Sequence, residues 1–369
     1  VALMATLSPL LIYYSQEARA YSFQVVLILS MVLMLEKAYR TGKTHYWAGY
    51  VSVTVIGIYL QLFTTLAWVM VSVYFLYRVW MTKNIGTLKP WIISQGVIIL
   101  LALPFGLYAM VPDTRETLSW IPKPHFKEIF RPLNYYVFGM SYRVLPHWLK
   151  ESGKYLVFIV MILALIPQKW GLKSWIKERT DQSGLVLMGL MGFGTWILFF
   201  LVSQVKPIFV PERYLIICLP FLLILIAVSI NRLSSKYLQG LALMVVLGCS
   251  LIGVVDNYTR NQKMPWRELV YPVHNQRRAD DIVWYYPEHI DSQIKFYLDD
   301  RPTPISIKYV PFYDPNPSAT IWVYTNTWET FPADYKGFLE THYRKTTVLI
   351  KNQPKYMELL RFDPLQPQS

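Results

Sequence analysis

A carboxylate and a guanidinium stand close together where a long apolar stretch begins. Glu17 and Arg19 lie in the segment 8–21, SPLLIYYSQEARAY, and the residues from there to Leu35 carry no further charge. Charged side chains are costly in an apolar helix, so a pair at its mouth needs a reason. The guanidinium could capture a phosphate, because it offers two parallel donors to phosphate oxygens. Alternatively, the two side chains pair with each other or extend toward water.

A second basic pair precedes a later apolar stretch. Lys206 is followed by Pro211-Glu212-Arg213-Tyr214, after which the chain is apolar up to residue 230. Arg213 would add a second guanidinium and Lys206 a point charge to a phosphate site at a membrane surface, above helices that could hold a lipid tail. The alternative is that Arg213 only anchors its helix at the interface.

The elements that would position these residues are membrane helices. The chain is 54% hydrophobic and only 16% charged, and its mean hydropathy is +0.29. This composition is typical of a multi-span membrane protein with a water-exposed portion. The cysteines, Cys218 and Cys249, lie inside apolar runs, so we expect them to be small core residues and not a disulfide.

The apolar stretches predict a mainly α fold, a polytopic transmembrane helical bundle. We expect about eight whole spans, because each stretch is long enough to cross the hydrocarbon core. Residues 1–7 are apolar, and we interpret them as the tail of a partial span whose start lies upstream, which would make the chain a fragment. The whole spans are predicted at residues 17–35, 46–60, 65–80, 90–111, 153–166, 183–203, 214–230 and 237–255.

The basic residues predict the orientation of the bundle. Residues 1–255 carry 22 Lys and Arg against 9 Asp and Glu, whereas residues 256–369 carry 14 of each. The short loops on one side of the predicted bundle hold twelve Lys and Arg, and those on the other side hold two, Lys206 and Arg213. The first side is therefore predicted to be cytoplasmic. This places the four candidate residues and the C-terminal domain on the outer face of the plasma membrane, and favours lipid headgroups or a phosphate-bearing substrate over nucleic acid.

A polar loop at residues 112–152 is predicted on the same outer face. Its segment Lys127–Met140 mixes basic residues with Phe, Leu, Tyr and Val, a composition suited to a helix that lies in the headgroup plane. The simpler interpretation is an anchoring belt. The alternative is that His125, Arg131 or Arg143 helps to form the rim of a lipid-phosphate site.

Residues 256–369 are predicted to form a small α/β domain on the outer face. Strands are expected at 281–286, 303–309, 320–324 and 346–351, and helices at 287–298 and 332–342. Asp280 with Asp281, or Asp299 with Asp300, could be paired acids, although adjacent acids more often flank the ends of strands or helices. We predict no cofactor, and the six scattered histidines show no metal-ligand spacing, so a divalent metal is left open.

Two motifs resemble a known family of membrane enzymes. The segment SPLLIYYSQEARAY with the span after it, and IYLQLFTTLAWVMVSVYFLYR at 58–78, resemble the GT-C superfamily of membrane glycosyltransferases. The likeness is to the dolichyl-phosphate-mannose protein mannosyltransferase-like group, which includes the bacterial aminoarabinose transferase. That group carries a QEAR-Y element at the outer start of a helix, here residues 16–19 with Tyr21. It also carries Pro-x-Arg-Tyr before a late span, here residues 211–214 leading to Pro220.

The resemblance implies an inverting transfer of a sugar from a polyprenyl-phosphate carrier to a lipid, glycan or protein acceptor at the outer membrane face. Arg19, Lys206 and Arg213 would hold the carrier phosphate and neutralise the charge that grows on it. The family's general base, an Asp of the first outer loop, is expected upstream of this chain. Glu17 would position Arg19 or line the cavity.

Tyrosines are implied at the same site. Tyr13, Tyr14 and Tyr21 could line the sugar site, because aromatic faces stack on sugar rings, and Tyr214 belongs to the second motif. The alternative for these tyrosines is an interfacial belt.

Two other classes of function stay open. A transporter or flippase of lipid-linked sugars would need ionisable residues near the bilayer midplane and two related halves with interrupted helices. The predicted spans hold few such residues, and the sequence shows no convincing internal repeat. A non-catalytic membrane assembly protein would need none of the proposed site chemistry.

Overall fold

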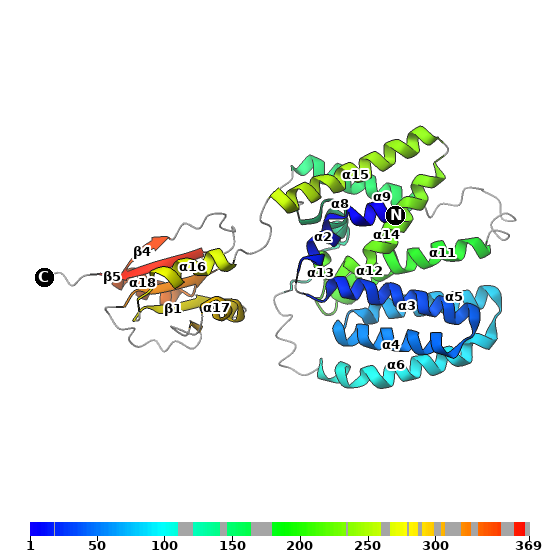
Figure 1. The fold of residues 1–369 in the computed structure, drawn as a ribbon, viewed down its shortest axis with the longest axis horizontal. Coiled ribbons are helices and arrows are strands. Elements are labelled where there is room, and N and C mark those ends of the chain that lie inside the picture. The colour runs from blue at the N-terminus through cyan, green and yellow to red at the C-terminus, as the bar shows by residue number, and fades with distance from the viewer. Residues whose placement is uncertain are drawn as a thin grey trace. The chain divides into compact units, whose positions relative to one another are not determined.

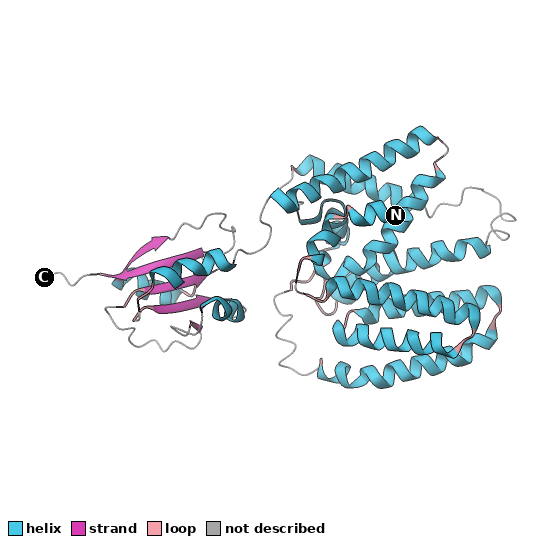
Figure 2. Ribbon diagram, in the orientation of Figure 1, coloured by secondary structure: helices cyan, strands magenta, loops and turns pink. Residues whose placement is uncertain are grey.

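Helices build most of the described residues up to 259, and one small sheet follows among the described residues after them (Figures 1 and 2). The structure is a computed structural model, and it divides into two compact units, Val1–Arg260 and Asn261–Ser369. It describes residues 1–17, 19–109, 121–140, 146–163, 179–233, 235–259, 266–278, 280–286, 290–298, 304–306, 319–325, 331–347 and 358–365.

The helices of the first unit follow the apolar stretches of the sequence. They are α1 (Ala2–Thr6), α2 (Pro9–Ser15), α3 (Tyr21–Thr41), α4 (Thr44–Leu60), α5 (Thr64–Thr82), η1 (Ile85–Thr87), α6 (Leu88–Tyr108), η2 (Phe126–Phe130), α8 (Arg131–Phe138), α9 (His147–Leu163), α11 (Arg179–Gly189), η4 (Leu190–Gly194), α12 (Thr195–Ser203), α13 (Pro211–Tyr214), η5 (Leu215–Cys218), α14 (Leu219–Arg232) and α15 (Lys236–Thr259).

Six segments among the described residues are long and apolar enough to cross a membrane. They are Tyr21–Thr41, Thr64–Thr82, Ile85–Tyr108, Ser183–Ser203, Pro211–Arg232 and Lys236–Thr259. The two other predicted spans correspond to α4 and α9, which have 17 residues each. At 1.5 Å per residue such a helix is about 26 Å long, somewhat less than a hydrocarbon core of about 30 Å.

Short turns fold α3, α4 and α5 against one another. Gly42 ends α3 with a φ of 67°, a conformation that glycine adopts without strain. The chain then returns as α4, and α3, α4 and α6 lie side by side (Figure 1). Outward-facing side chains of α6, such as Leu100 and Leu107, are more than half exposed, as expected for a helix that faces lipid.

The short helix α2 is fixed by a close fit to two glycines. A Cβ atom at Gly253 of α15 would lie 2.6 Å from the carbonyl oxygen of Phe138 and 2.8 Å from Cβ of Pro9, the first residue of α2. A Cβ at Gly139 would lie 2.9 Å from the same proline. The side-chain amide of Asn257 donates to the Pro9 carbonyl at 2.8 Å. Small residues therefore allow α2 to enter the bundle, and its far end leads to the turn at residues 16–20.

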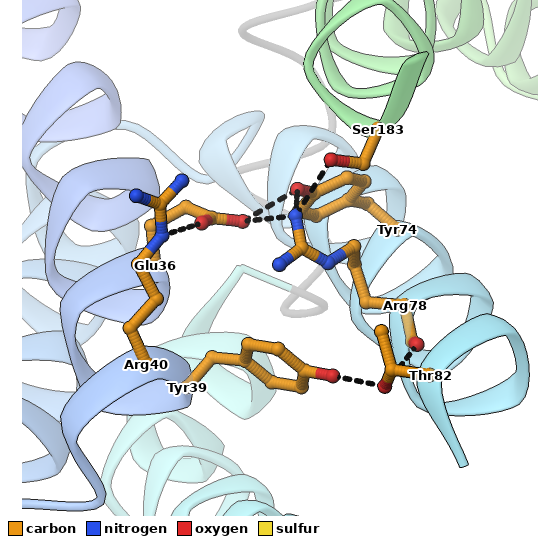
Figure 3. A network of polar contacts seen from close by, with 7 residues as sticks. All are labelled: Glu36, Tyr39, Arg40, Tyr74, Arg78, Thr82 and Ser183. Atoms are coloured by element: carbon orange, nitrogen blue, oxygen red, sulfur yellow. Dashed lines mark hydrogen bonds and ion pairs between the residues drawn. The ribbon is translucent and has the colours of Figure 1, made fainter. Parts of the chain in front are cut away.

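A network of polar side chains joins α3, α5 and α11 (Figure 3). Arg78 lies 3.5 Å from a carboxylate oxygen of Glu36, and its Nη1 donates to Ser183 at 2.8 Å. Tyr74 donates to Glu36 and accepts from Arg78 at 2.9 Å. The side chains of Glu36 and Arg78 are only 15% and 14% exposed. We call this network the polar clamp; its members are Glu36, Tyr39, Arg40, Tyr74, Arg78, Thr82 and Ser183.

The predicted interfacial helix is placed differently from our expectation. The segment Lys127–Met140 does form helices, η2 and α8, but every residue of α8 from Pro132 to Phe138 is buried. The Tyr136 hydroxyl donates to the Leu215 carbonyl at 2.7 Å, and α8 packs against α2, α9 and α15. The composition resembled an interfacial helix because aromatic residues suit both environments, but here protein buries every residue of the helix after Arg131.

The second unit is a five-stranded mixed sheet with helices on both faces. The strand order is β2-β1-β3-β5-β4, with β2, β1 and β3 parallel and β5 antiparallel to both β3 and β4. One face packs against α16 and α17, and the other against α18. The elements are α16 (Trp266–Gln276), β1 (Ile282–Tyr286), α17 (Asp291–Leu298), β2 (Ile305–Ser306), β3 (Ile321–Thr325), α18 (Ala333–His342), β4 (Tyr343–Thr347) and β5 (Glu358–Pro364).

The sequence predicted most of these elements. The described residues contain strands and helices within or next to each expected range, and the expected residues 287–289, 303, 307–309 and 348–351 lie outside the described residues. α16 and β5 were not predicted. Asp281 flanks a strand: its carboxylate accepts from the Arg278 amide and the Trp322 indole, both at 3.0 Å, just before β1.

Replacing Gly253 should loosen α2. A valine there would force its Cβ against a backbone oxygen, which cannot move aside as a flexible side chain can, so we expect Gly253→Val to lower the free energy of unfolding by about 1–3 kcal/mol. Thermal unfolding in detergent measures the change. Gly248→Val is the matched control on the same helix, because nothing lies within 4 Å of a Cβ at that position. Equal effects of the two variants would show that α2 does not depend on this fit.

The stability that the polar clamp provides should depend on Arg78, which is largely shielded, more than on Arg40, which is exposed. Arg78→Ala removes the partner of a shielded carboxylate, and we expect it to lower the free energy of unfolding by about 1.5–3 kcal/mol. Arg40 also binds Glu36, at 3.0 Å, but its side chain is 71% exposed. Arg40→Ala should therefore cost less than about 1 kcal/mol. Equilibrium unfolding of both variants tests this order, and the reverse order would contradict it.

Candidate functional site

Glu17 and Arg19 form an ion pair in the turn between α2 and α3. The distance from Arg19 Nε to Glu17 Oε2 is 3.9 Å, and the side chains are 51% and 20% exposed, respectively. The contact is long for a charge-assisted hydrogen bond, which is typically 2.7–2.9 Å. The guanidinium is therefore only loosely held, and its outer half faces solvent or a ligand.

The aromatic residues of both motifs form one continuous row. The ring of Tyr14 lies 5.0 Å from that of Tyr21, which lies 6.3 Å from that of Tyr214. The ring of Tyr214 in turn lies 4.5 Å from Phe63. Tyr14 is buried, whereas Tyr13 at the edge of the row is partly exposed. The row brings the two sequence motifs, nearly 200 residues apart, to one place.

Charges from both motifs surround Tyr14. Burial raises the pKa of its phenol well above the usual range; Arg213 opposes this shift, while Glu17 and Glu212 add to it. The phenol therefore stays protonated and can donate a hydrogen bond. Arg213 and Arg19 also lie within electrostatic range of the Tyr214 hydroxyl. The structure thus brings Glu17, Arg19, Arg213, Tyr14 and Tyr214 together.

A serine fixes the loop that carries the second motif. The Ser203 hydroxyl at the end of α12 accepts from the backbone amides of Ile208 and Phe209, at 2.7 and 2.8 Å. Pro211 then starts α13, where its missing N–H costs nothing. The hydrogen bonds of Ser203 and the start of α13 at Pro211 together fix the position of Arg213 and Tyr214.

The helix α8 adds a third guanidinium. Arg131 lies 3.9 Å from Glu128 and 6.0 Å from the ring of Tyr135. Burial works against its charge, but Tyr135, Glu212 and Glu128 favour it and hold the pKa above its usual value. One turn on, Asn134 is buried, and its Oδ1 has no hydrogen-bond partner. We call the charged cluster the residues Glu17, Arg19, Arg131, Glu212 and Arg213.

Lys206 lies at an apolar pocket beside the charged cluster. The pocket has a volume of about 420 Å³, and Tyr214 belongs both to its lining and to the aromatic row. The lysine is exposed, and among the described residues its ammonium has no hydrogen-bond or ion-pair partner. The rest of the lining is mostly apolar and comes from the α4–α5 turn, the end of α6 and the end of α12: Leu60, Gln61, Leu62, Phe63, Thr65, Leu66, Phe105, Tyr108, Ala109, Val202 and Ile208.

The arrangement can bind a molecule with an anionic head and an apolar tail. Three guanidiniums and a buried tyrosine hydroxyl offer donors to an oxyanion, and the adjoining pocket accepts hydrocarbon. Sequence reasoning assigned no role to Glu212 or Asn134. Arg131 was raised only as an alternative, together with His125, which precedes η2, and Arg143, which lies outside the described residues.

No known protein helps to assign this site. Comparison of the chain with protein-family models, with curated proteins and with solved structures found no match. Within the described residues, no group of three or more His, Cys, Asp and Glu side chains could hold a metal ion. The assignment of function therefore rests on the charged cluster, the aromatic row and the pocket.

Ser203 should be needed to hold the second motif in place. Ser203→Ala leaves two buried amides without an acceptor, and we expect it to lower the free energy of unfolding by about 1–3 kcal/mol and to speed proteolysis of the loop 204–210. Ser229→Ala is the control, because the Ser229 hydroxyl is buried without a hydrogen-bond partner and its loss should be neutral. Thermal unfolding and limited proteolysis measure both effects; an unchanged loop in Ser203→Ala would contradict the role given to this serine.

Proposed function

We propose that this chain is part of a membrane glycosyltransferase that takes a sugar from a polyprenyl-phosphate carrier. The observation that carries the proposal is the charged cluster beside an apolar pocket, whose lining shares Tyr214 with the aromatic row. A lipid phosphate needs both halves: cations for its head and an apolar surface for its tail. The resemblance of the two motifs to the GT-C superfamily supplies the reaction.

In that reaction an acceptor hydroxyl attacks the anomeric carbon while the bond from this carbon to the phosphate oxygen breaks. The bonding electrons leave with the phosphate, so negative charge grows there. Arg19 and Arg213 would stabilise this charge, and fixed donors aimed at a developing charge are the largest contribution in many enzymes. The acceptor proton passes to a base, which in the family that the motifs resemble is an Asp of the first outer loop.

The remaining residues divide between the two parts of the donor. Lys206 stands at the pocket and would contribute to the phosphate as a point charge, while Phe63 and Phe105 would contact the first units of the lipid. Tyr14 would donate to an oxygen of the donor, because its phenol is kept protonated. Glu17 would hold Arg19 until the donor binds, which the loose 3.9 Å contact allows.

We further propose that α4 and α9 also cross the membrane, which gives eight spans and an outer face for the site and the C-terminal unit. The packing of α4 supports this: it runs beside α3 between two short turns, so the chain returns along α3 before α5 starts. A slightly short helix is accommodated by local thinning of the bilayer. The excess of basic residues in the loops on the other side supports the orientation.

Binding of the carrier should depend on the two motif arginines. The chain, in lipid nanodiscs, is titrated with polyprenyl phosphate and, separately, with the polyprenol that lacks the phosphate. We expect Arg19→Ala and Arg213→Ala each to weaken binding of the phosphate about tenfold or more, because a charge-assisted hydrogen bond contributes about 1.5–3 kcal/mol. Polyprenol binding should be unchanged. Lys89→Ala, which removes an exposed cation next to η1, is the control.

Transfer is tested on the protein in its full natural length, with polyprenyl-phosphate sugars as donors. The proposal expects sugar on an acceptor and its loss in Arg19→Ala. Undiminished transfer in this variant would overturn the role of Arg19. Binding of the carrier without transfer, but with movement of the labelled lipid across the bilayer, would favour a flippase.

A further inference from the structure

Two turns at one end of the bundle carry an excess of positive charge. They join α3 to α4 and α5 to η1, and residues 36–46 and 78–87 hold five Lys and Arg against one acid, Glu36. This acid is already paired within the polar clamp, where Arg78 is shielded. The other four cations are exposed, and we call them the basic patch: Lys37, Arg40, Lys43 and Lys83.

A hydrogen bond brings the two turns together. The hydroxyls of Tyr39, near the end of α3, and Thr82, the last residue of α5, are hydrogen-bonded to each other (Figure 3). The guanidinium of Arg78 also lies over the Tyr39 ring, 4.9 Å from its centre. The two helices therefore end side by side, and the cations of both turns belong to one region of the surface.

Lys83 has a backbone conformation that lysine rarely adopts. Its φ is 57°, and among the described residues it is the only residue other than glycine with a positive φ. The equivalent position at the end of α3 is Gly42, with a φ of 67°. Glycine takes this conformation without strain, whereas a side chain raises its free energy. The turn itself therefore favours glycine at position 83, and the lysine side chain needs another reason.

Exposed apolar side chains lie beside the basic patch. Trp80 and Ile85 stand on either side of Lys83 in the sequence and are 60% and 68% exposed. The ammonium of Lys83 lies 5.9 Å from the centre of the Trp80 ring, and that of Lys37 lies 5.5 Å from the ring of Tyr46. Tryptophan and tyrosine are enriched where the hydrocarbon core of a bilayer meets the headgroups. Each turn thus offers a cation and an aromatic ring at the same place.

We propose that the basic patch binds the headgroup of an anionic phospholipid, with Trp80 and Ile85 against its acyl chains. An anionic headgroup complements the positive charge that the single, already paired acid leaves uncompensated. The exposed apolar side chains favour a lipid over a free anion, which would leave them in water. The basic patch lies at the opposite end of α3 from Glu17 and Arg19, and the proposal does not depend on the glycosyl transfer proposed above.

Titration of the detergent-solubilised chain tests the basic patch, with phosphatidylglycerol, phosphatidylcholine and inorganic phosphate as separate probes. Hydrogen–deuterium exchange in the two turns reports binding. We expect phosphatidylglycerol to slow exchange there and the other two probes to have little effect. Lys43→Gln and Lys83→Gln should each weaken the response about fivefold, the contribution of one cation near an anionic lipid surface. Lys127→Gln is the control, because Lys127 is an exposed cation of η2 and lies in neither turn.

A second variant separates lipid binding from a structural role. Lys83→Gly relieves the positive φ, so it should raise the unfolding midpoint in phosphatidylcholine nanodiscs and reduce the further stabilisation that phosphatidylglycerol gives. A lysine that served only the helix end or Trp80 would give a lower midpoint. The proposal is overturned if phosphatidylcholine or inorganic phosphate slows exchange as much as phosphatidylglycerol does, or if phosphatidylglycerol has no effect. It is also overturned if Lys127→Gln weakens the response as much as Lys83→Gln, or if Lys83→Gly lowers the midpoint in phosphatidylcholine.

Discussion

Glu36 and Arg78, 3.5 Å apart and each about 15% exposed, are stable in an apolar bundle because they pair with each other and with neighbouring polar side chains. Tyr74 donates to Glu36, Ser183 accepts from Arg78, and Arg78 also lies 4.9 Å from the ring of Tyr39. The same constraint explains where charges occur at all. Between its two ends α3 carries no charged residue. The nearest charged residues precede its first turn or lie in its last two turns. The polar clamp holds the helices together at one end of the bundle. Short helices and turns can therefore form the other end.

The two charged ends differ in how completely they are paired. In the polar clamp both carboxylate oxygens of Glu36 have partners, and the arginine between the helices is shielded. In the charged cluster the ion pair of Glu17 and Arg19 is long, and half of the arginine is exposed. A carboxylate with both oxygens paired gains little from a ligand, whereas a loosely paired guanidinium can turn toward one at small cost. This contrast supports the binding role proposed for Arg19 and a role in stability for the polar clamp.

The sequence predicted the features that depend on residues close together in the chain. The long apolar stretches predicted α3, α5, α6 and the later spans, and the motif residues Arg19 and Arg213 were predicted to share a site because both precede apolar stretches. Long-range packing could not be predicted in this way. Nothing in the local sequence of α8 shows that Gly139 and Gly253 let α2 pack beside it, which buries the helix and carries Arg131 toward Glu212.

The shape of the site follows from the cost of moving a phosphate into hydrocarbon. A doubly or singly charged oxyanion cannot enter the apolar pocket, and an isoprenoid tail gains nothing among arginines. The proposed lipid phosphate would therefore bind only where both environments meet without a gap, and Tyr214 lies at that junction. Its ring faces Phe63 at 4.5 Å on the side of the pocket, and its hydroxyl lies within range of Arg213 and Arg19 on the other side. An amphipathic side chain is suited to this position because it offers each half of the ligand a surface of its own kind. The same reasoning explains why Lys206, at the edge of the pocket and without a partner among the described residues, is placed to meet a charge that stays near water.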